Sequence, residues 1–136
     1  MILADTSAWV EYDRATGSPV DERMAELIAS GSSLAVTEPV MMEVLARART
    51  ADREDDLRRL LLSVTLLPVE PVADFDAAAR IYRRCRESGV TPRGLLNCLI
   101  AAVGWRHGAS LLAHDVDLDR VAGVVGLPLD DASLRA

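Results

Sequence analysis

Short apolar segments alternate with longer amphipathic segments along the chain. The apolar segments are predicted to be strands, and they occupy residues 1–4, 34–36, 66–70, 110–113 and 127–129. Most are bounded by Gly, Pro, Ser, Thr or Asp, which favour turns and helix caps. Short buried strands separated by helices indicate βαβ units, and therefore a mostly parallel sheet covered by helices on both faces.

The intervening segments predict helices, each with recognisable end signals. Thr91 and Pro92 resemble an N-cap and first-turn pair, while Gly89 and Gly108 resemble C-terminal caps. Thr37 with Pro39 gives another helix start. The first predicted helix begins near Ala8. The others span residues 20–28, 40–48, 52–63, 73–89, 94–108 and 114–126.

The size and composition favour one domain over residues 1–136. Half of the 136 residues are apolar, which is enough for a core without disulfides or structural metal. Cys85 and Cys98 lie in helical patterns without a CxxC spacing, which suggests two buried thiols in a reducing compartment. No apolar run approaches a membrane span, and the N-terminus lacks the basic region of a signal peptide. We therefore expect a cytoplasmic protein.

The charge pattern restricts the choice of partners. The net charge is −6, and all 15 basic residues are arginine. An acidic domain is not an obvious nucleic-acid-binding protein, because phosphate contacts normally come from a basic surface. A polyanionic substrate would need bound metal cations or a local group of arginines.

Oxygen-bearing side chains occur where the predicted strands end. Asp5 follows the first strand, and Asp115 and Asp117 follow the fourth. Glu43 interrupts an apolar helix after the second strand, and Asn97 interrupts the apolar helix before the fourth. In open α/β sheets the functional crevice lies outside the carboxyl ends of the strands. We therefore expect these five side chains to converge.

Converging carboxylates repel one another unless a cation neutralises them. Oxygen ligands without Cys or His select Mg²⁺ or Mn²⁺. Such an ion lowers the pKa of a bound water and stabilises charge on a phosphodiester under attack. The pattern is therefore typical of a metal-dependent nuclease.

Each of these residues also has a purely structural interpretation. Asp5 and Asp115 could be helix N-caps, and Glu43 could form an i,i+4 pair with Arg47. Asp117 could complement a helix dipole in the first turn. A histidine at a strand end, as at position 114, is more often a packing or hydrogen-bonding residue than a ligand.

The sequence resembles the PIN domain, and within it the VapC toxins of bacterial VapBC toxin–antitoxin pairs. The segments that carry the resemblance are ILADTSAWVEY, TEPVMMEVLARAR and TPRGLLNCLIAAVGWRHGASLLAHDVDLDRVA, followed by the closing hydrophobic strand. Together they span nearly the whole chain. The resemblance implies a three-layer α/β/α sandwich with a central, roughly five-stranded sheet. It also implies an Mg²⁺- or Mn²⁺-dependent endoribonuclease that a VapB-type antitoxin inhibits, working as a homodimer and in toxin–antitoxin hetero-oligomers.

The resemblance also implies roles for individual residues. The catalytic positions are Asp5, Glu43, Asn97 and Asp115, and the metal set is Asp5, Asn97, Asp115 and Asp117. Thr6 and Ser7 are accessory hydroxyls beside the first acid.

Asn97 departs from the family pattern, which has an aspartate here. An amide offers a cation one neutral oxygen and cannot act as a base. We therefore expect a weakened or inactive nuclease, through an engineered substitution or a natural variant whose remaining acids suffice. The alternative is a non-catalytic PIN-fold interaction module.

Other acidic α/β enzymes fit less well. A haloacid-dehalogenase-type phosphatase needs an aspartate where Ser7 stands and also a lysine, and a receiver domain needs a lysine too. The chain has none. With five aromatic residues, recognition of RNA would depend on its shape and backbone. Phosphate contacts would come from arginines such as Arg14, Arg47, Arg49, Arg93 and Arg106.

Overall fold

The centre of the protein is a four-stranded parallel sheet. The computed structural model describes residues 1–31 and 33–136. The strand order is β3-β2-β1-β4, with every neighbouring pair parallel. The strands are β1 (Ile2–Ala4), β2 (Leu34–Val36), β3 (Thr65–Leu66) and β4 (Ser110–Leu112). Leu3 is paired with Ala35 on one side and with Leu111 on the other. The predicted parallel α/β sheet is confirmed.

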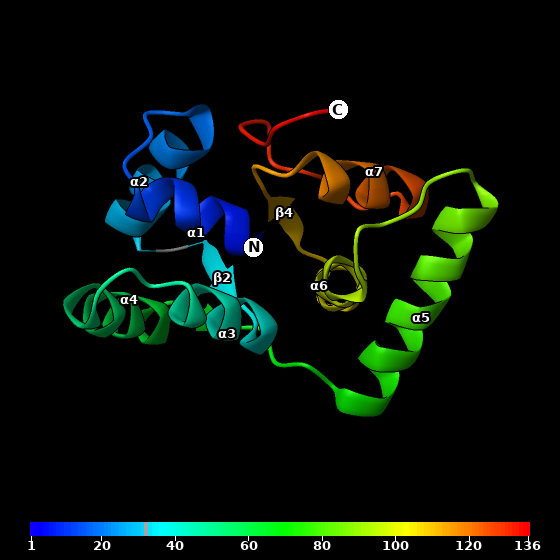
Figure 1. The fold of residues 1–136 in the computed structure, drawn as a ribbon, viewed down its shortest axis with the longest axis horizontal. Coiled ribbons are helices and arrows are strands. Elements are labelled where there is room, and N and C mark those ends of the chain that lie inside the picture. Colours follow the sequence, from blue (N-terminus) through cyan, green and yellow to red (C-terminus); the bar gives the residue numbers. More distant parts are fainter. Residues whose placement is uncertain (32) are drawn as a thin grey trace.

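Helices flank this sheet and form most of the molecule (Figure 1). Their bounds are α1 (Thr6–Asp13), α2 (Pro19–Ser30), α3 (Glu38–Ala46), α4 (Ala51–Ser63), α5 (Pro71–Glu87), α6 (Leu95–Arg106) and α7 (Val116–Val125). The inner strand β2 is apolar and buried throughout, as expected for a strand covered on both faces, whereas both residues of the edge strand β3 are exposed.

Local capping chemistry sets several helix ends. Ser18 caps α2 by accepting a hydrogen bond from the Asp21 backbone N–H, and Pro19 occupies the first turn. Gly31 ends α2 with a left-handed conformation, which glycine adopts without strain. Helix α1 begins at Thr6, two residues earlier than predicted, because the Asp5 side chain caps it.

Helix α6 is the most deeply buried helix segment. Residues 98–104 are all buried, including the free thiol Cys98. Gly104 allows α6 to lie against β4, since a Cβ there would be 3.2 Å from Leu111 Cδ2. Helix α5 packs mainly against the outer side of α6 (Figure 1). An ion pair fastens these two helices, with Arg106 Nε and Nη2 each 2.9 Å from an oxygen of the buried Asp74. The Arg106 guanidinium lowers the pKa of the Asp74 carboxyl.

Two predicted strands are shorter than expected. The strand predicted for residues 127–129 is reduced to a single bridge between Leu111 and Leu129. The segment 66–70 contributes only its first residue to β3. Pro128 explains the first result, because proline has no N–H with which to continue a ladder, but Pro68 does not explain the second. Residues 1–31 and 33–136 therefore form four strands where about five were predicted.

The predicted start of the helix containing Asn97 was wrong. Helix α6 begins at Leu95, with extended Gly94 at its N-cap, so Thr91 and Pro92 lie outside it. The Arg93 backbone N–H donates instead to Asp117 Oδ1 at 3.1 Å. This bond holds the segment before α6 against the first turn of α7.

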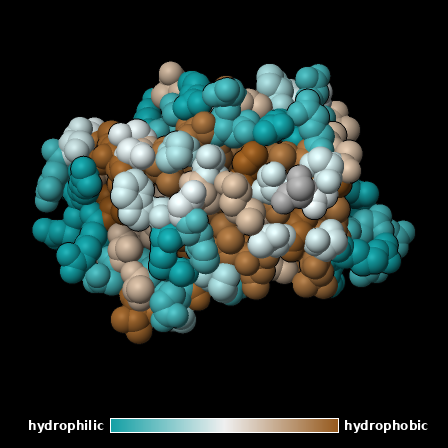
Figure 2. Space-filling model, turned by 180° about the vertical axis from the view of Figure 1, so that it is seen from behind, coloured by the Kyte–Doolittle hydropathy of each residue, from teal (hydrophilic) through white to brown (hydrophobic). Residues whose placement is uncertain are grey.

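The face seen from behind has hydrophobic side chains across its middle and lower part, with hydrophilic side chains at its margins (Figure 2). Large exposed apolar residues of the chain include Leu66, Val72, Phe75 and Trp105. Within the described residues, no helix is long and apolar enough to cross a membrane.

Leu111 provides a test of the core. It is fully buried in β4, so Leu111→Ala should lower the free energy of unfolding by about 2–5 kcal/mol, because packing is removed and a cavity remains. Leu62→Ala on α4 is the control, because Leu62 is 69% exposed and its removal should change stability by less than about 0.5 kcal/mol. Urea denaturation measures both values. Equal effects of the two substitutions would contradict this packing.

Candidate active site

A cleft at the carboxyl ends of β1 and β4 contains four of the five predicted oxygen-bearing residues. It has a volume of about 510 Å³, and its lining includes Asp5, Glu43, Asn97 and Asp115. Thr6 and Ser7 also line it. Asp117 is buried and lines an adjoining hollow with Asp115. The predicted convergence is therefore present in the structure.

Asp5 lies at the floor of this cleft. Its Oδ1 accepts hydrogen bonds from the Ala8 backbone N–H at 3.0 Å and from Ser7 Oγ at 2.7 Å. Burial raises the pKa of the Asp5 carboxyl to about 7. The hydrogen bonds from Ser7 and Ala8 lower this pKa, and the negative charges of Asp115 and Glu43 raise it further. The carboxylate form of Asp5 therefore needs a compensating positive charge near neutral pH.

The two hydroxyls beside Asp5 connect the walls of the cleft. Thr6 Oγ1 donates to Glu43 Oε1 at 2.5 Å, which joins the start of α1 to α3. Ser7 Oγ accepts a hydrogen bond from the His114 backbone N–H at 2.7 Å, which joins α1 to the segment after β4. Thr6 and Ser7 thus orient the acids around them.

Asn97 presents hydrogen-bond donors to two acids. Its Nδ2 lies 3.2 Å from Asp115 Oδ2 and 2.8 Å from Asp117 Oδ2. Asp115 also caps α7, with its Oδ1 accepting from the Asp117 backbone N–H at 2.9 Å. An aspartate at position 97 would replace this donor with a third carboxylate. The asparagine therefore relieves repulsion inside the protein itself.

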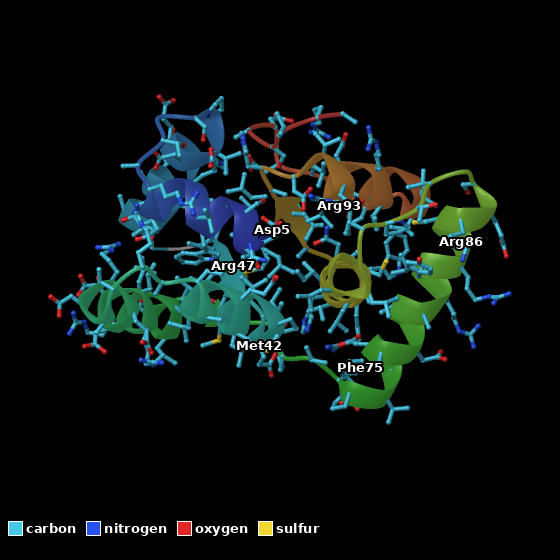
Figure 3. The ribbon with its side chains drawn as sticks, viewed as in Figure 1. Asp5, Met42, Arg47, Phe75, Arg86 and Arg93 are labelled. Carbon is cyan, nitrogen blue, oxygen red and sulfur yellow. The ribbon has the colours of Figure 1, made fainter. Side chains whose placement is uncertain are left out.

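Two arginines form ion pairs with acids at the edge of the cleft. The Arg93 guanidinium pairs with Asp115, and Arg47 Nη2 lies 3.5 Å from Glu43 Oε2. Their side chains are 72% and 66% exposed, so both pairs face solvent. Figure 3 shows Asp5 between Arg47 and Arg93 near the middle of the molecule. Asp5 and Asp115 fulfil both interpretations given from the sequence, because they are helix N-caps and also line the cleft.

The oxygen atoms of the cleft fit a hard divalent cation that takes only a few of its ligands from the protein. Among the described residues, no three His, Cys, Asp or Glu side chains form a group that could hold a metal ion. Mg²⁺ usually keeps several waters and uses only one or two carboxylates, so Asp5 and Asp115 with an amide oxygen suffice chemically. The amide nitrogen of Asn97 faces the acids, and the oxygen would have to turn toward an ion.

Other candidate residues lie elsewhere or serve different contacts. Arg106 is bound by Asp74 and is not part of the cleft. His114 lines the cleft, and its Nε2 is 3.6 Å from Glu11 Oε1. Sequence reasoning missed Glu11 as a lining residue. The available signal was its position four residues after Ser7, which places both on one face of α1.

The fold and the cleft define the protein as a parallel α/β domain with an acidic site at the carboxyl ends of its strands. Comparisons with known proteins agree on its family. Residues 2–124 match the model of the PIN domain. The chain is 43% identical over 128 residues to Ribonuclease VapC11 of Mycobacterium tuberculosis strain H37Rv, covering 93% of this chain and 96% of that protein. The chain belongs to the PIN domain family, in the group that includes the VapC ribonucleases.

Solved structures agree on the fold. VapBC2 from Rickettsia felis, crystallised with a DNA fragment from its promoter, gives a TM-score of 0.74 at 14% identity, covering 98% of this chain and 99% of that one. DNA-bound VapBC from Salmonella typhimurium gives 0.75 at 15% identity, covering 96% and 97%. At such low identity these structures support the architecture alone.

The raised pKa of Asp5 predicts a pH dependence of stability. The folded chain keeps the Asp5 proton up to about pH 7, whereas the unfolded chain loses it near 3.8. The stability of the wild type relative to Asp5→Asn should therefore fall by about 1.4 kcal/mol per pH unit across this window as pH rises. Urea denaturation in EDTA measures the difference. A difference that stays constant between pH 4 and 7 would contradict the burial of an unpaired carboxyl.

Restoring a carboxylate at position 97 should make stability depend on metal. In EDTA, Asn97→Asp should lower the free energy of unfolding by about 1–3 kcal/mol, because two hydrogen bonds are replaced by repulsion. Mn²⁺ should reverse this effect by binding the folded state. Thermal unfolding with and without Mn²⁺ is the measurement. Asn97→Ala removes the same donors without adding charge, so Mn²⁺ should stabilise it less. Equal responses of the two variants would refute the account.

Proposed function

We propose that residues 1–136 form one PIN domain that acts as a divalent-metal-dependent endoribonuclease toxin of the VapC type. It would hydrolyse RNA phosphodiester bonds in the cytoplasm. The observation that carries the proposal is the cleft that unites Asp5, Glu43, Asn97 and Asp115. The 43% sequence identity to Ribonuclease VapC11, over nearly the full length of both chains, supports the proposal.

The cleft residues have distinct roles in this proposal. Asp5, Asp115 and the oxygen of Asn97 would hold Mg²⁺ or Mn²⁺, with Asp117 as an accessory ligand or holder of a metal-bound water. When bound, the ion would supply Lewis-acid stabilisation of the phosphate and lower the pKa of a water. Glu43 accepts a hydrogen bond from Thr6 and lines the same cleft, and in this proposal it would accept a proton from the attacking water.

The cleft arginines would bind the substrate rather than react. Arg47 and Arg93 have exposed guanidinium groups within the lining of the cleft. A guanidinium donates two parallel hydrogen bonds to phosphate, which fixes the orientation of the phosphodiester beside the acids. The protein can in this way attract RNA locally in spite of its net charge of −6.

Asn97 should weaken the activity. It lowers the negative charge of the site by one and directs its donor group at Asp115 and Asp117. An ion would have to displace these hydrogen bonds before binding. The remaining acids, Asp5 and Asp115, would provide residual affinity for metal.

A VapB-type antitoxin is the proposed protein partner. The structures of similar fold from Rickettsia felis and Salmonella typhimurium are VapBC complexes. We extend this partnership to the present chain, together with a homodimer of the toxin. The exposed apolar side chains, such as Phe75 and Trp105, offer surface that protein contacts would cover.

A non-catalytic PIN module is the second candidate function. Asn97 and Arg93 already give Asp115 and Asp117 hydrogen-bond or ion-pair partners in the absence of an ion. A fold kept only for binding a partner would tolerate this arrangement.

Cleavage of a total-RNA pool separates the two functions. We expect Asn97→Asp to cut RNA with Mn²⁺ at least about tenfold faster than the wild type, since ligand charge controls metal affinity. Asp5→Asn in the same background should abolish cutting, as should EDTA. Gel analysis of chains purified free of antitoxin is the measurement. Equal cutting by wild type and Asn97→Asp would show that the charge is dispensable, and no cutting by any form would favour the interaction module.

A further inference from the structure

A second, smaller pocket adjoins the acidic cleft on the side of α1 and α3. It has a volume of about 150 Å³ and shares Val10 and Arg47 with the cleft. Its remaining walls come from the end of α1, from α3 and the loop after it, and from α4. A chain that occupies the cleft can therefore continue into this pocket past Arg47.

Three arginines, Arg14, Arg47 and Arg49, line this pocket. Arg14 and Arg49 are exposed and have no acidic partner within ion-pair distance in the part of the chain that the structure describes. One carboxylate, Asp13, also lines the pocket. It is already neutralised by Arg53, whose Nε is 2.9 Å from Asp13 Oδ1. The pocket therefore has an excess of positive charge.

This excess is unusual in so acidic a protein. Nine of the fifteen arginines form ion pairs with Asp or Glu of the described residues. Of the other six, three belong to the exposed end of α5, and three flank the acidic cleft. Two of these three share the small pocket, and Arg120 lies on the opposite side of the cleft. With acids outnumbering arginines, unpaired guanidiniums beside a phosphodiester site indicate binding of an external anion.

One buried hydrogen-bond donor also belongs to a residue of the pocket wall. Trp9 lines the same pocket, and its indole Nε1 is the one buried side-chain nitrogen or oxygen among the described residues without a hydrogen-bond partner. Buried polar groups are normally paired, so an orphaned N–H marks a place where an acceptor is favourable. Because Trp9 is fully buried, an anion in the pocket would meet the exposed guanidinium groups of Arg14 and Arg49 first.

We infer that this pocket, formed by Trp9, Arg14, Arg47 and Arg49, is a phosphate subsite that binds the RNA backbone next to the phosphodiester held in the acidic cleft. The inference rests on the proposed ribonuclease function and deepens it by giving the substrate a direction. RNA would pass from the acids over Arg47 to Arg14 and Arg49. Binding here uses backbone charge, which suits a chain with few aromatic residues for base stacking.

The double substitution Arg14→Gln/Arg49→Gln tests the subsite. Neither residue lines the acidic cleft or forms an ion pair with another described residue, so the fold should be retained. Binding of a short fluorescein-labelled single-stranded RNA should weaken by about tenfold at low salt. The slope of log affinity against log salt should become shallower by about 0.7 for each RNA phosphate that the protein no longer neutralises.

The matched control is Arg83→Gln/Arg86→Gln on α5. It removes the same charge from exposed arginines that also lack acidic partners within the described residues, and Arg86 lies far from Asp5 in Figure 3. Its effect on RNA affinity and on the salt slope should be clearly smaller. Fluorescence anisotropy measures binding, and a denaturing gel of the same samples measures cleavage.

The outcomes separate this inference from the proposed function. If Asn97→Asp cuts RNA while Arg14→Gln/Arg49→Gln binds RNA as the wild type does, the subsite is refuted and the nuclease stands. Equal reductions in affinity for both arginine pairs would refute the subsite as well, since only net charge would matter. Unchanged RNA binding with weakened antitoxin binding would assign the arginines to the protein partner instead. Failure of the wild type to bind RNA would overturn both proposals.

Discussion

Mutual repulsion among acids at the carboxyl ends of β1 and β4 is the constraint on which the site depends. Parallel pairing of Leu3 with Leu111 brings the residues after both strands to one edge. Asp5 is buried there and feels the charges of Glu43 and Asp115. The surrounding structure compensates by giving each carboxylate a donor: Thr6 for Glu43, Ser7 for Asp5, and Asn97 and Arg93 for Asp115. The arrangement is stable through this compensation.

The same compensation connects folding to function. Asp5 and Asp115 are N-caps of α1 and α7, so the residues that begin these helices also form the floor of the cleft. Their orientation is set by backbone N–H groups that donate to Oδ1 of each acid, while Asp115 Oδ2 accepts a hydrogen bond from Asn97. Helix capping therefore supplies rigid positioning of the proposed metal ligands. It also explains why the acids can remain close together when Asn97 provides a neutral donor.

The distribution of arginine is the second organising feature. Most arginines form ion pairs with acids of the protein, including the pair of Arg106 with Asp74 that joins α5 to α6. The net charge of −6 therefore says little about the potential near the cleft. There, Arg47 and Arg93 face solvent beside the acids, and unpaired arginines continue into the adjoining pocket. A locally positive margin around an acidic centre is suited to a phosphodiester chain that approaches acids.

The sequence by itself determined the parallel α/β class, most helix positions and the convergence of Asp5, Glu43, Asn97 and Asp115, because hydrophobic periodicity and strand-end position are local properties. It also determined that position 97 carries no charge. Only the tertiary structure decided that α6 starts at Leu95, that Arg106 is bound by Asp74 rather than by the cleft, and that Arg93 pairs with Asp115. These features depend on contacts between residues 22–32 positions apart in the chain, and no local pattern encodes which partner a long, flexible arginine will reach.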